Sequence, residues 1–274
     1  MAGLGPDRLS LNTATLRAQW SLAQCIEGCA RHGIAGIGPW RDKLQEMGVK
    51  EAARAIRAAG LEVSGLCRGG WFTAEGAITQ AVADDNRRAV DEAAEIGAAC
   101  LVMVVGGLPD GSRDLAHAHA LVEEGLAKTL DHARGVGMPV AIEPLHPMYA
   151  ADRACVNTTR HALDICDRLG EGIGVALDVY HVWWDPELAG QIARSGRDRL
   201  LAFHICDWLM PTRDLLTDRG MMGDGVIDIP HIRGLVEAAG FTGLIEVEIF
   251  SAENWWKRDP DEVLSVMIER AGAC

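Results

Sequence analysis

The chain has 274 residues, of which 49% are hydrophobic and 24% are charged, so it can form a large buried core and is not intrinsically disordered. Lys and Arg number 26 against 39 Asp and Glu, which gives a formal net charge of −13. This charge argues against general binding to nucleic acid, although it leaves room for a local basic pocket that takes a small anion.

Eight short apolar segments are predicted to form strands, and six of them follow a glycine that ends a helical stretch. Glycine suits the C-terminus of a helix because it adopts the left-handed conformation without strain. The segments lack strict alternation, as expected of parallel strands buried on both faces. In chain order they are 9–13, 34–37, 61–67, 100–105, 139–144, 173–178, 200–206 and 244–250.

Helical stretches lie between these segments, for example at 89–96 and 115–136. The last helix is predicted to begin with Asp259 as N-cap, Pro260 at the first position and Glu262 completing a capping box. Repeated strand–helix units predict a closed (β/α)8 TIM barrel, with residues 1–274 as a single domain. An open doubly wound sheet is the alternative, but no Gly-x-Gly-x-x-Gly follows the first strand.

Cysteine usage and hydropathy indicate a cytoplasmic protein. The eight cysteines are scattered singly, without a Cys-x-x-Cys pair, which predicts buried reduced thiols. No apolar run approaches the roughly 20 residues that span a bilayer, and the first residues lack the pattern of a signal peptide. We therefore expect no association with membranes.

Acidic or imidazole side chains stand near the ends of the last four predicted strands, where a TIM barrel has its active site. Ionised groups in apolar strands are costly unless they are compensated, and converging carboxylates repel one another. A divalent cation removes both problems. The predicted ligands are Glu143, Asp178, His204 and one of the two strand-eight glutamates, Glu246 and Glu248.

The two glutamates of the eighth strand point to the same face because they are two positions apart. Glu248 lies nearer the C-terminal end of the strand and is the better ligand. Glu246 is expected deeper in the barrel, in an ion pair or a hydrogen bond. The oxygen-rich set with one nitrogen suits Mn²⁺, Mg²⁺ or Co²⁺ better than a structural zinc, with Zn²⁺ as an alternative.

Five motifs, at 142–144, 177–181, 203–207, 223–228 and 243–251, resemble those of the xylose isomerase-like TIM barrels. This sugar phosphate isomerase/epimerase family includes ketose 3-epimerases, hydroxypyruvate isomerases, inosose dehydratases and isomerases, dehydroshikimate dehydratases and endonuclease IV-type enzymes. The resemblance covers nearly the whole chain. It implies one divalent ion, Mn²⁺ first, on Glu143, Asp178, His204 and Glu248, and a substrate contact from His181. It also implies a homodimer or homotetramer.

The substrate contacts are less defined. In the ketose epimerases an arginine follows the metal histidine at a short fixed distance, and neither arginine of the corresponding loop matches cleanly. An arginine after the third strand could bind a substrate carboxylate or hydroxyl, or pair with a neighbouring acid. Tryptophans after strands could stack on a sugar ring or pack under the barrel rim. The candidate substrate contacts are Arg68, Trp71, His146, Trp184, Arg213 and Arg219.

The expected reaction is proton transfer beside the carbonyl of a small carbohydrate, which is a sugar, a sugar phosphate or a polyol-derived ketone. Glu143 and Glu248 would act as acid and base through an enediolate, and His181 would steady the charged oxygen. Loss of a β-hydroxyl from the same intermediate would instead give a dehydratase of inosose or dehydroshikimate type. A DNA-repair endonuclease is disfavoured by the net charge, and a non-catalytic protein by the complete ligand set.

Overall fold

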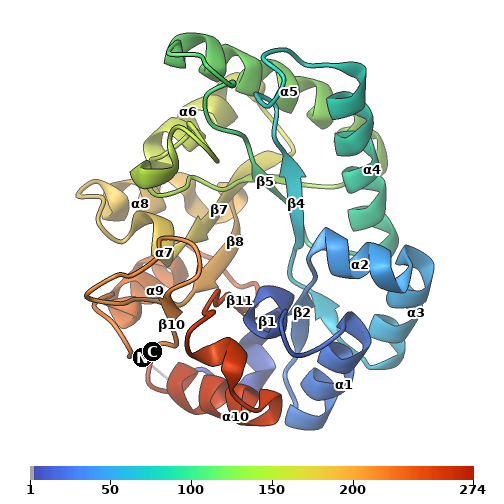
Figure 1. Cartoon of the computed structure of the whole chain (residues 1–274), viewed down its shortest axis with the longest axis vertical. Helices are drawn as coiled ribbons and strands as arrows, with labels where there is room; N and C mark the ends of the chain where they lie inside the picture. Colours follow the sequence, from blue (N-terminus) through green and yellow to red (C-terminus); the bar gives the residue numbers. More distant parts are fainter. Residues whose placement is uncertain (1–2) are drawn as a thin grey trace.

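The fold is given by a computed structural model that describes residues 3–274. Its strands surround a central barrel and its helices lie outside them (Figure 1). The strands are β1 (Leu9–Asn12), β2 (Gly36–Gly38), β3 (Glu62–Val63), β4 (Leu66–Gly70), β5 (Leu101–Val104), β6 (Val140–Ile142), β7 (Ile173–Asp178), β8 (Leu200–Ile205), β9 (Asp207–Trp208), β10 (Arg219–Gly220) and β11 (Ile245–Val247).

The helices alternate with the strands along the chain. The α-helices are α1 (Leu22–His32), α2 (Arg41–Met47), α3 (Val49–Ala58), α4 (Gln80–Ile96), α5 (Leu115–Val136), α6 (Thr159–Leu169), α7 (Val179–Val182), α8 (Leu188–Arg199), α9 (Ile229–Ala238) and α10 (Pro260–Ala271). Four 3-10 helices accompany them: η1 (Pro6–Arg8), η2 (Thr13–Leu16), η3 (Pro147–Tyr149) and η4 (Trp255–Lys257).

Nine strands form one parallel sheet in the order β3-β2-β1-β11-β8-β7-β6-β5-β4. Its two end strands, β3 and β4, are consecutive in the chain, and parallel bridges between Trp40 and Cys67 and between Val63 and Ala98 bring the edges together. The predicted TIM barrel is therefore confirmed. The predicted third strand at 61–67 is present as two pieces, because its first part pairs with β2 and its second part with β5.

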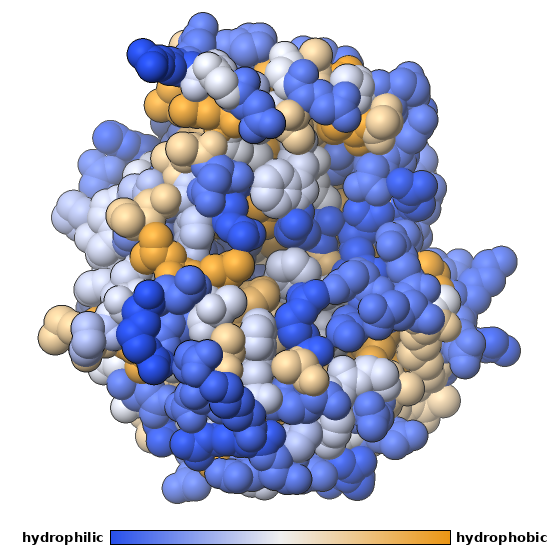
Figure 2. All heavy atoms as spheres, in the orientation of Figure 1, coloured by the Kyte–Doolittle hydropathy of each residue, from blue (hydrophilic) through white to orange (hydrophobic). Residues whose placement is uncertain are grey.

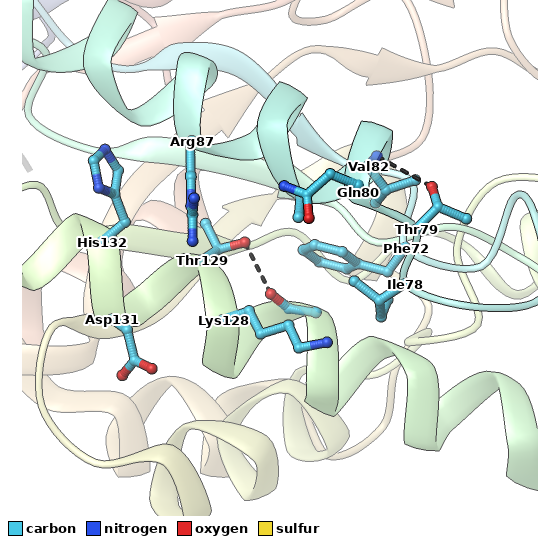
Figure 3. A pocket seen from close by; sticks show the side chains of 12 residues that line it. Phe72, Ile78, Thr79, Gln80, Val82, Arg87, Lys128, Thr129, Asp131 and His132 are labelled. Atoms are coloured by element: carbon cyan, nitrogen blue, oxygen red, sulfur yellow. Dashed lines mark hydrogen bonds between the residues drawn. The ribbon is translucent and has the colours of Figure 1, made fainter.

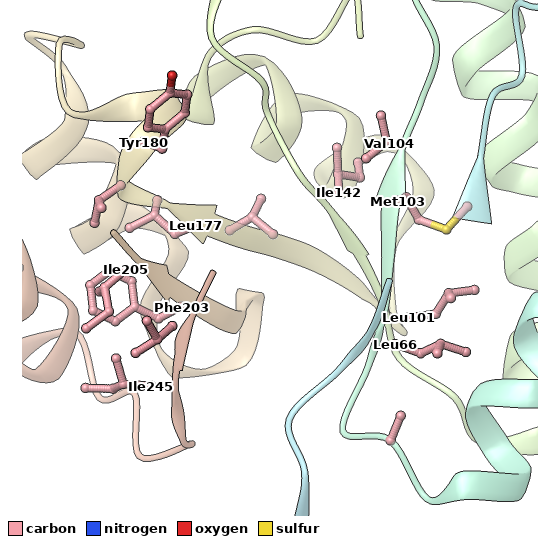
Figure 4. Packing of buried hydrophobic residues seen from close by; sticks show 14 of the residues in the cluster. Leu66, Leu101, Met103, Val104, Ile142, Leu177, Tyr180, Phe203, Ile205 and Ile245 are labelled. Atoms are coloured by element: carbon pink, nitrogen blue, oxygen red, sulfur yellow. The ribbon is translucent and has the colours of Figure 1, made fainter. Parts of the chain in front are cut away.

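Alternation along the strands separates an outer apolar layer from the barrel interior. Leu66, Leu101, Leu177 and Phe203 pack among the large side chains of the core (Figure 4). A separate interior cluster consists of small residues, namely Cys67, Cys100, Val102, Ala141, Ala176 and Ala202. Residues two positions further along a strand share its face, so the acids and the imidazole that follow these alanines also point into the barrel.

The helix boundaries agree largely with the predicted signals. Gly33, Gly97 and Gly137 end α1, α4 and α5 in the left-handed conformation. Helix α10 begins at Pro260, and the Asp259 side chain accepts a hydrogen bond from the Glu262 N–H. Helix α4 begins nine residues before the predicted 89–96 stretch, at Gln80, because its first turns are polar and lie partly in solvent.

The thiols and the surface also agree with expectation. All eight cysteines fall within residues 3–274 and are free, and seven of them are buried. Burial raises the pKa of the Cys100 thiol to about 12, so it is protonated and inert. No helix among the described residues is long and apolar enough to cross a membrane. The face in Figure 2 is largely hydrophilic, with small apolar areas scattered over it.

Candidate metal centre

Four side chains from neighbouring strands meet inside the barrel. Glu143 follows β6, Asp178 ends β7, His204 belongs to β8 and Glu248 follows β11. All four are buried, and each offers a ligand atom within 4.8 Å of the others. The structure therefore brings the four predicted ligands close enough to share one ion. Glu246 is not part of this set.

Unsatisfied polar atoms show that the cluster fits a cation. Glu143 Oε1 and both ring nitrogens of His204 are buried without a hydrogen-bond partner among the described residues. His204 Nδ1 lies 3.4 Å from Glu143 Oε1, which is a polar contact without hydrogen-bond geometry. Buried polar groups are rarely left unpaired. Three carboxylates and one imidazole are a donor set for Mn²⁺, Mg²⁺, Co²⁺ or Zn²⁺.

The pKa values of His204 and Glu248 are shifted because several carboxylates are buried close together. Burial alone lowers the pKa of His204, but the charges of Glu246, Glu143 and Glu248 outweigh it and raise that pKa to about 10. Burial raises the pKa of Glu248 to about 8, even though Arg219 opposes the shift. Strongly shifted groups that converge in one interior are typical of functional sites. A divalent cation would offset the excess charge.

Arg219 stands beside the ligands rather than at the rim. It lies in β10, which pairs with β9, and its side chain is buried. Nη1 donates to Asp178 Oδ2 at 2.9 Å and to Glu248 Oε2 at 3.1 Å. The guanidinium also lies 4.3 Å from the centre of the Tyr180 ring. Of the two loop arginines predicted for the substrate, this one reaches the cluster, and it holds two of the ligand carboxylates in place.

A second layer of polar groups supports the glutamates of the last strand. Asn12, at the end of β1, donates to Glu246 Oε1 and, at 3.0 Å, to Glu248 Oε1. Ser64 donates to Glu246 Oε2. A Cβ on Gly38 would lie only 2.4 Å from Glu246 Oε1, so glycine is required there. Glu246 thus has the hydrogen-bonding role that its earlier position in the strand predicts.

Asn12 and Ser64 were missed by sequence reasoning, although a weak signal exists. Asn12 ends a strand, and Ser64 lies just before one. Asn12 and Ser10 are two positions apart, so they lie on the same face of an otherwise apolar strand. Ser10 Oγ lies 2.6 Å from Ser64 Oγ. Alternating polar residues in a strand buried on both faces indicate that one face lines a polar interior.

His181, in the short helix α7, has a donor against each ring nitrogen. The His146 N–H lies 3.2 Å from Nδ1, and Arg219 Nη2 lies 3.3 Å from Nε2. Nε2 also lies 3.6 Å from Asp178 Oδ2. Burial lowers the pKa of His181 to about 3, so the ring is neutral and carries one N–H. The ring can therefore accept only one of these two hydrogen bonds, and it can donate towards the cluster only with its proton on Nε2.

A model of the family described as "Xylose isomerase-like TIM barrel" matches residues 26–266. The chain belongs to this family. An inosose isomerase of Bacillus velezensis is 25% identical over 154 residues, which cover 55% of this chain and 53% of that protein. The match thus spans about half the length of this curated relative.

Solved structures show the same barrel. A protein of Sinorhizobium meliloti 1021 is 60% identical, with a TM-score of 0.96 over 98% of both chains. The IOLI protein, whose crystal structure contains a zinc atom, has a TM-score of 0.80 at 18% identity over 96% of both chains. At that identity the likeness is one of fold.

The other predicted substrate contacts lie at different places in this xylose isomerase-like barrel. Trp184 packs edge-on to His146, with ring centres 5.7 Å apart, and His146 adjoins His181. Arg213 is exposed and pairs with Asp218. The structure does not bring Arg213 to the cluster, because its guanidinium is engaged at the surface of the loop.

A large hollow lies away from the ligands. It measures about 570 Å³ and lies between α4 and α5 (Figure 3). Phe72, Arg87, Lys128 and His132 are among its lining residues, and none of the four ligands is. His132 is already paired with Asp91 at 2.7 Å. The convergence of titratable groups, rather than the size of this hollow, locates the candidate site.

Proposed function

We propose that the chain is a metal-dependent isomerase or epimerase that moves a proton beside the carbonyl of a sugar, a sugar phosphate or a polyol-derived ketone. The observation that carries this proposal is the buried cluster of Glu143, Asp178, His204 and Glu248 within 4.8 Å. Membership of the xylose isomerase-like family and the match to an inosose isomerase support it. Mn²⁺ is the ion that we propose first.

A bound divalent ion would supply polarisation of the substrate carbonyl and stabilisation of an enediolate. Glu143 and Glu248 then act as the pair of proton carriers. Glu143 Oε1 has no hydrogen-bond partner among residues 3–274 and is free to accept a proton. Both oxygens of Glu248 already accept hydrogen bonds, from Asn12 and Arg219. His181 Nε2–H steadies the developing negative charge on the substrate oxygen.

Replacement of either glutamate by Gln tests the roles. Glu143→Gln and Glu248→Gln should leave the fold intact and lower the rate by about two orders of magnitude or more, as expected for loss of an acid or base. The assay is exchange of solvent deuterium into the α-carbon of a panel of ketoses, inososes and keto acids, with and without Mn²⁺. Near-normal exchange in either variant would refute its role. An enone product in place of an epimer would identify a dehydratase.

A further inference from the structure

Arg68, in the middle of β4, has no carboxylate of residues 3–274 within ion-pair distance, although the charge of Glu143 acts on it from further away. Its guanidinium lies 4.5 Å from the centre of the Trp71 ring and 5.8 Å from that of Trp40. Within the described part of the chain, its side chain makes no ion pair and donates no hydrogen bond. Trp71 holds a positive φ of 55°, which is unfavourable for a bulky residue. The backbone is thus held in a costly conformation that places this indole against the guanidinium.

Three other arginines, Arg17, Arg41 and Arg219, are paired with carboxylates, unlike Arg68. Arg41 donates to Asp85 and Glu92. Arg17 pairs with Asp42, and Arg219 pairs with two ligand carboxylates. The chain carries an excess of 13 negative charges, so a carboxylate partner for Arg68 would have been easy to supply. A guanidinium left with only aromatic neighbours retains its full set of donors for a ligand.

A hollow of about 280 Å³ adjoins Arg68. It is lined by Arg17, Trp40, Arg41, Asp42, Cys67 and Arg68. Trp40 Nε1 donates to Asn12 Oδ1 at 2.9 Å, and Asn12 in turn donates to the predicted ligand Glu248. One hydrogen-bonded residue, Asn12, therefore connects the lining of the hollow to the metal cluster.

A second cation lies near Arg68. Arg153 makes no ion pair among the described residues, and its guanidinium lies 5.8 Å from the Tyr149 ring. Tyr149 adjoins His181, with ring centres 5.8 Å apart. Burial, together with the positive charges of Arg153 and Arg41, lowers the pKa of Arg68 to about 10, although Cys67 and Glu143 oppose the shift. The two guanidinium groups thus repel each other, and an anion between or beside them would relieve that repulsion.

We propose that the substrate carries an oxyanion, a carboxylate or a phosphate, that Arg68 binds while the carbonyl end of the substrate faces the four-ligand cluster. Arg153 adds a second positive charge on the same side. Arginine suits this role because its planar fork matches the oxygens of both anions. The inference names the substrate class of the reaction proposed above and rests on that proposal.

Matched neutral and anionic sugars test the inference by binding, without turnover. The probes are D-fructose against D-fructose 6-phosphate, and D-glucose against D-glucuronate, with the Mn²⁺-loaded protein. Fluorescence of Trp71 and Trp40 reports occupancy beside Arg68, and calorimetry gives the dissociation constants. We expect at least one anionic sugar to bind roughly tenfold or more tightly than its neutral partner, the range of hydrogen bonds to charged groups. Tighter binding of D-fructose 6-phosphate would identify a phosphate site, and tighter binding of D-glucuronate would identify a carboxylate site.

Arg68→Gln should abolish the preference, so that the two sugars of each pair bind with similar dissociation constants, and Arg153→Gln should reduce it. Arg54→Gln, an exposed arginine on α3, is the matched control and should retain it. Equal binding of neutral and anionic sugars by the unmodified protein would overturn the inference, as would a preference that survives in Arg68→Gln. A preference that depends on Arg68 without deuterium exchange on any probe would uphold the anion site and count against the proposed reaction.

Discussion

Glu246 is buried next to His204 but is not one of the four grouped ligands. It accepts hydrogen bonds from Asn12 and Ser64, and its Oε1 lies 3.8 Å from His204 Nε2. Carboxylates in this position commonly fix the orientation of a metal-binding histidine. The negative charge of Glu246 therefore acts on the candidate metal site through the His204 ring.

Glu246→Gln should weaken Mn²⁺ binding by roughly 10- to 100-fold, the range for loss of such an outer partner. The substitution removes a negative charge next to His204. It also replaces one carboxylate oxygen by an NH2 group, which cannot accept the hydrogen bond that Asn12 or Ser64 donates to the carboxylate. Calorimetric titration with Mn²⁺ gives the dissociation constant. Glu253→Gln, an exposed glutamate paired with Lys257, is the control and should bind as the unmodified protein does. Unchanged affinity in the Glu246 variant would show that the residue is only structural.

At the scale of single residues, the ligand set could be predicted from the acids and the histidine near the C-terminal ends of the strands and from the family motifs, because a TIM barrel has its active site at that end. Arg219 was harder to separate from Arg213, since spacing along a loop does not fix where a side chain points. The pairing of β10 with β9 turns Arg219 inwards. Asn12 ends β1 and Ser64 follows β3, more than 50 residues apart in the chain, so their convergence on Glu246 depends on tertiary structure.

Helices α2 and α4 are joined by a cluster of ionic hydrogen bonds. Arg41, the first residue of α2, donates to Asp85 and Glu92 of α4. The hydrogen bonds from Arg41 lower the pKa of Asp85 from 3.8 to about 2, although burial opposes them. A carboxylate with a depressed folded pKa stabilises the fold above its unfolded pKa. That contribution is lost as the pH falls from about 3.8 towards 2.

Asp85→Asn should therefore lower stability at about pH 6 and lose most of its effect by about pH 2, where about half of the unmodified Asp85 is itself protonated in the folded state. The measurement is the urea midpoint of both proteins across this pH range. Asp85 is nearly half exposed, so the difference should be small and should fall with added salt. A difference that is constant with pH would mean that the carboxylate charge is not its cause.

The N-terminus of α10 offers a cleaner test of local structure. The Asp259 side chain accepts the Glu262 N–H at 3.1 Å. Asp259→Ala should lower the free energy of unfolding by about 1 kcal/mol, the typical effect of losing an N-cap. Equilibrium urea unfolding measures it, and Asp110→Ala, which alters an acid in a loop outside the helices, is the comparison. Equal stability of the two variants would contradict the capping role.

The helix signals explain why some elements could be predicted closely and others could not. Helix α10 has an N-cap, a proline and an apolar face, and α5 ends at a glycine, so local chemistry determines their boundaries. The third strand was predicted as one segment and is two, because the change of partner from β2 to β5 is set by barrel closure. No short stretch of the sequence determines this change of strand partner.

The whole molecule should respond to the ion, because a ligand that binds only the folded state stabilises it. Mn²⁺ at 100 times its dissociation constant adds about 2.7 kcal/mol, which corresponds to a rise in Tm of roughly 5–10 °C for a chain of this size. Thermal unfolding with Mn²⁺ and with EDTA measures the shift. Asp178→Asn should show little or none of it. A shift of equal size in that variant would place the ion elsewhere.

The overall barrel was predictable because the strand–helix rhythm runs through the whole chain. The proposed preference for an anionic substrate could not be predicted in this way, because it depends on which arginines lack a carboxylate partner in the folded structure. Arg68 could be expected either to pair with an acid or to bind substrate, and only its surroundings separate these outcomes. Its neighbours are Trp40 and Trp71 rather than a carboxylate.

We propose that one divalent ion binds between four side chains of neighbouring strands. Anomalous diffraction at the Mn absorption edge, from crystals grown with Mn²⁺, would locate this ion. We predict one strong peak, at roughly 2.0–2.3 Å from an atom of each of Glu143, Asp178, His204 and Glu248. No peak inside the barrel at saturating Mn²⁺, or a peak held by other residues, would contradict the account.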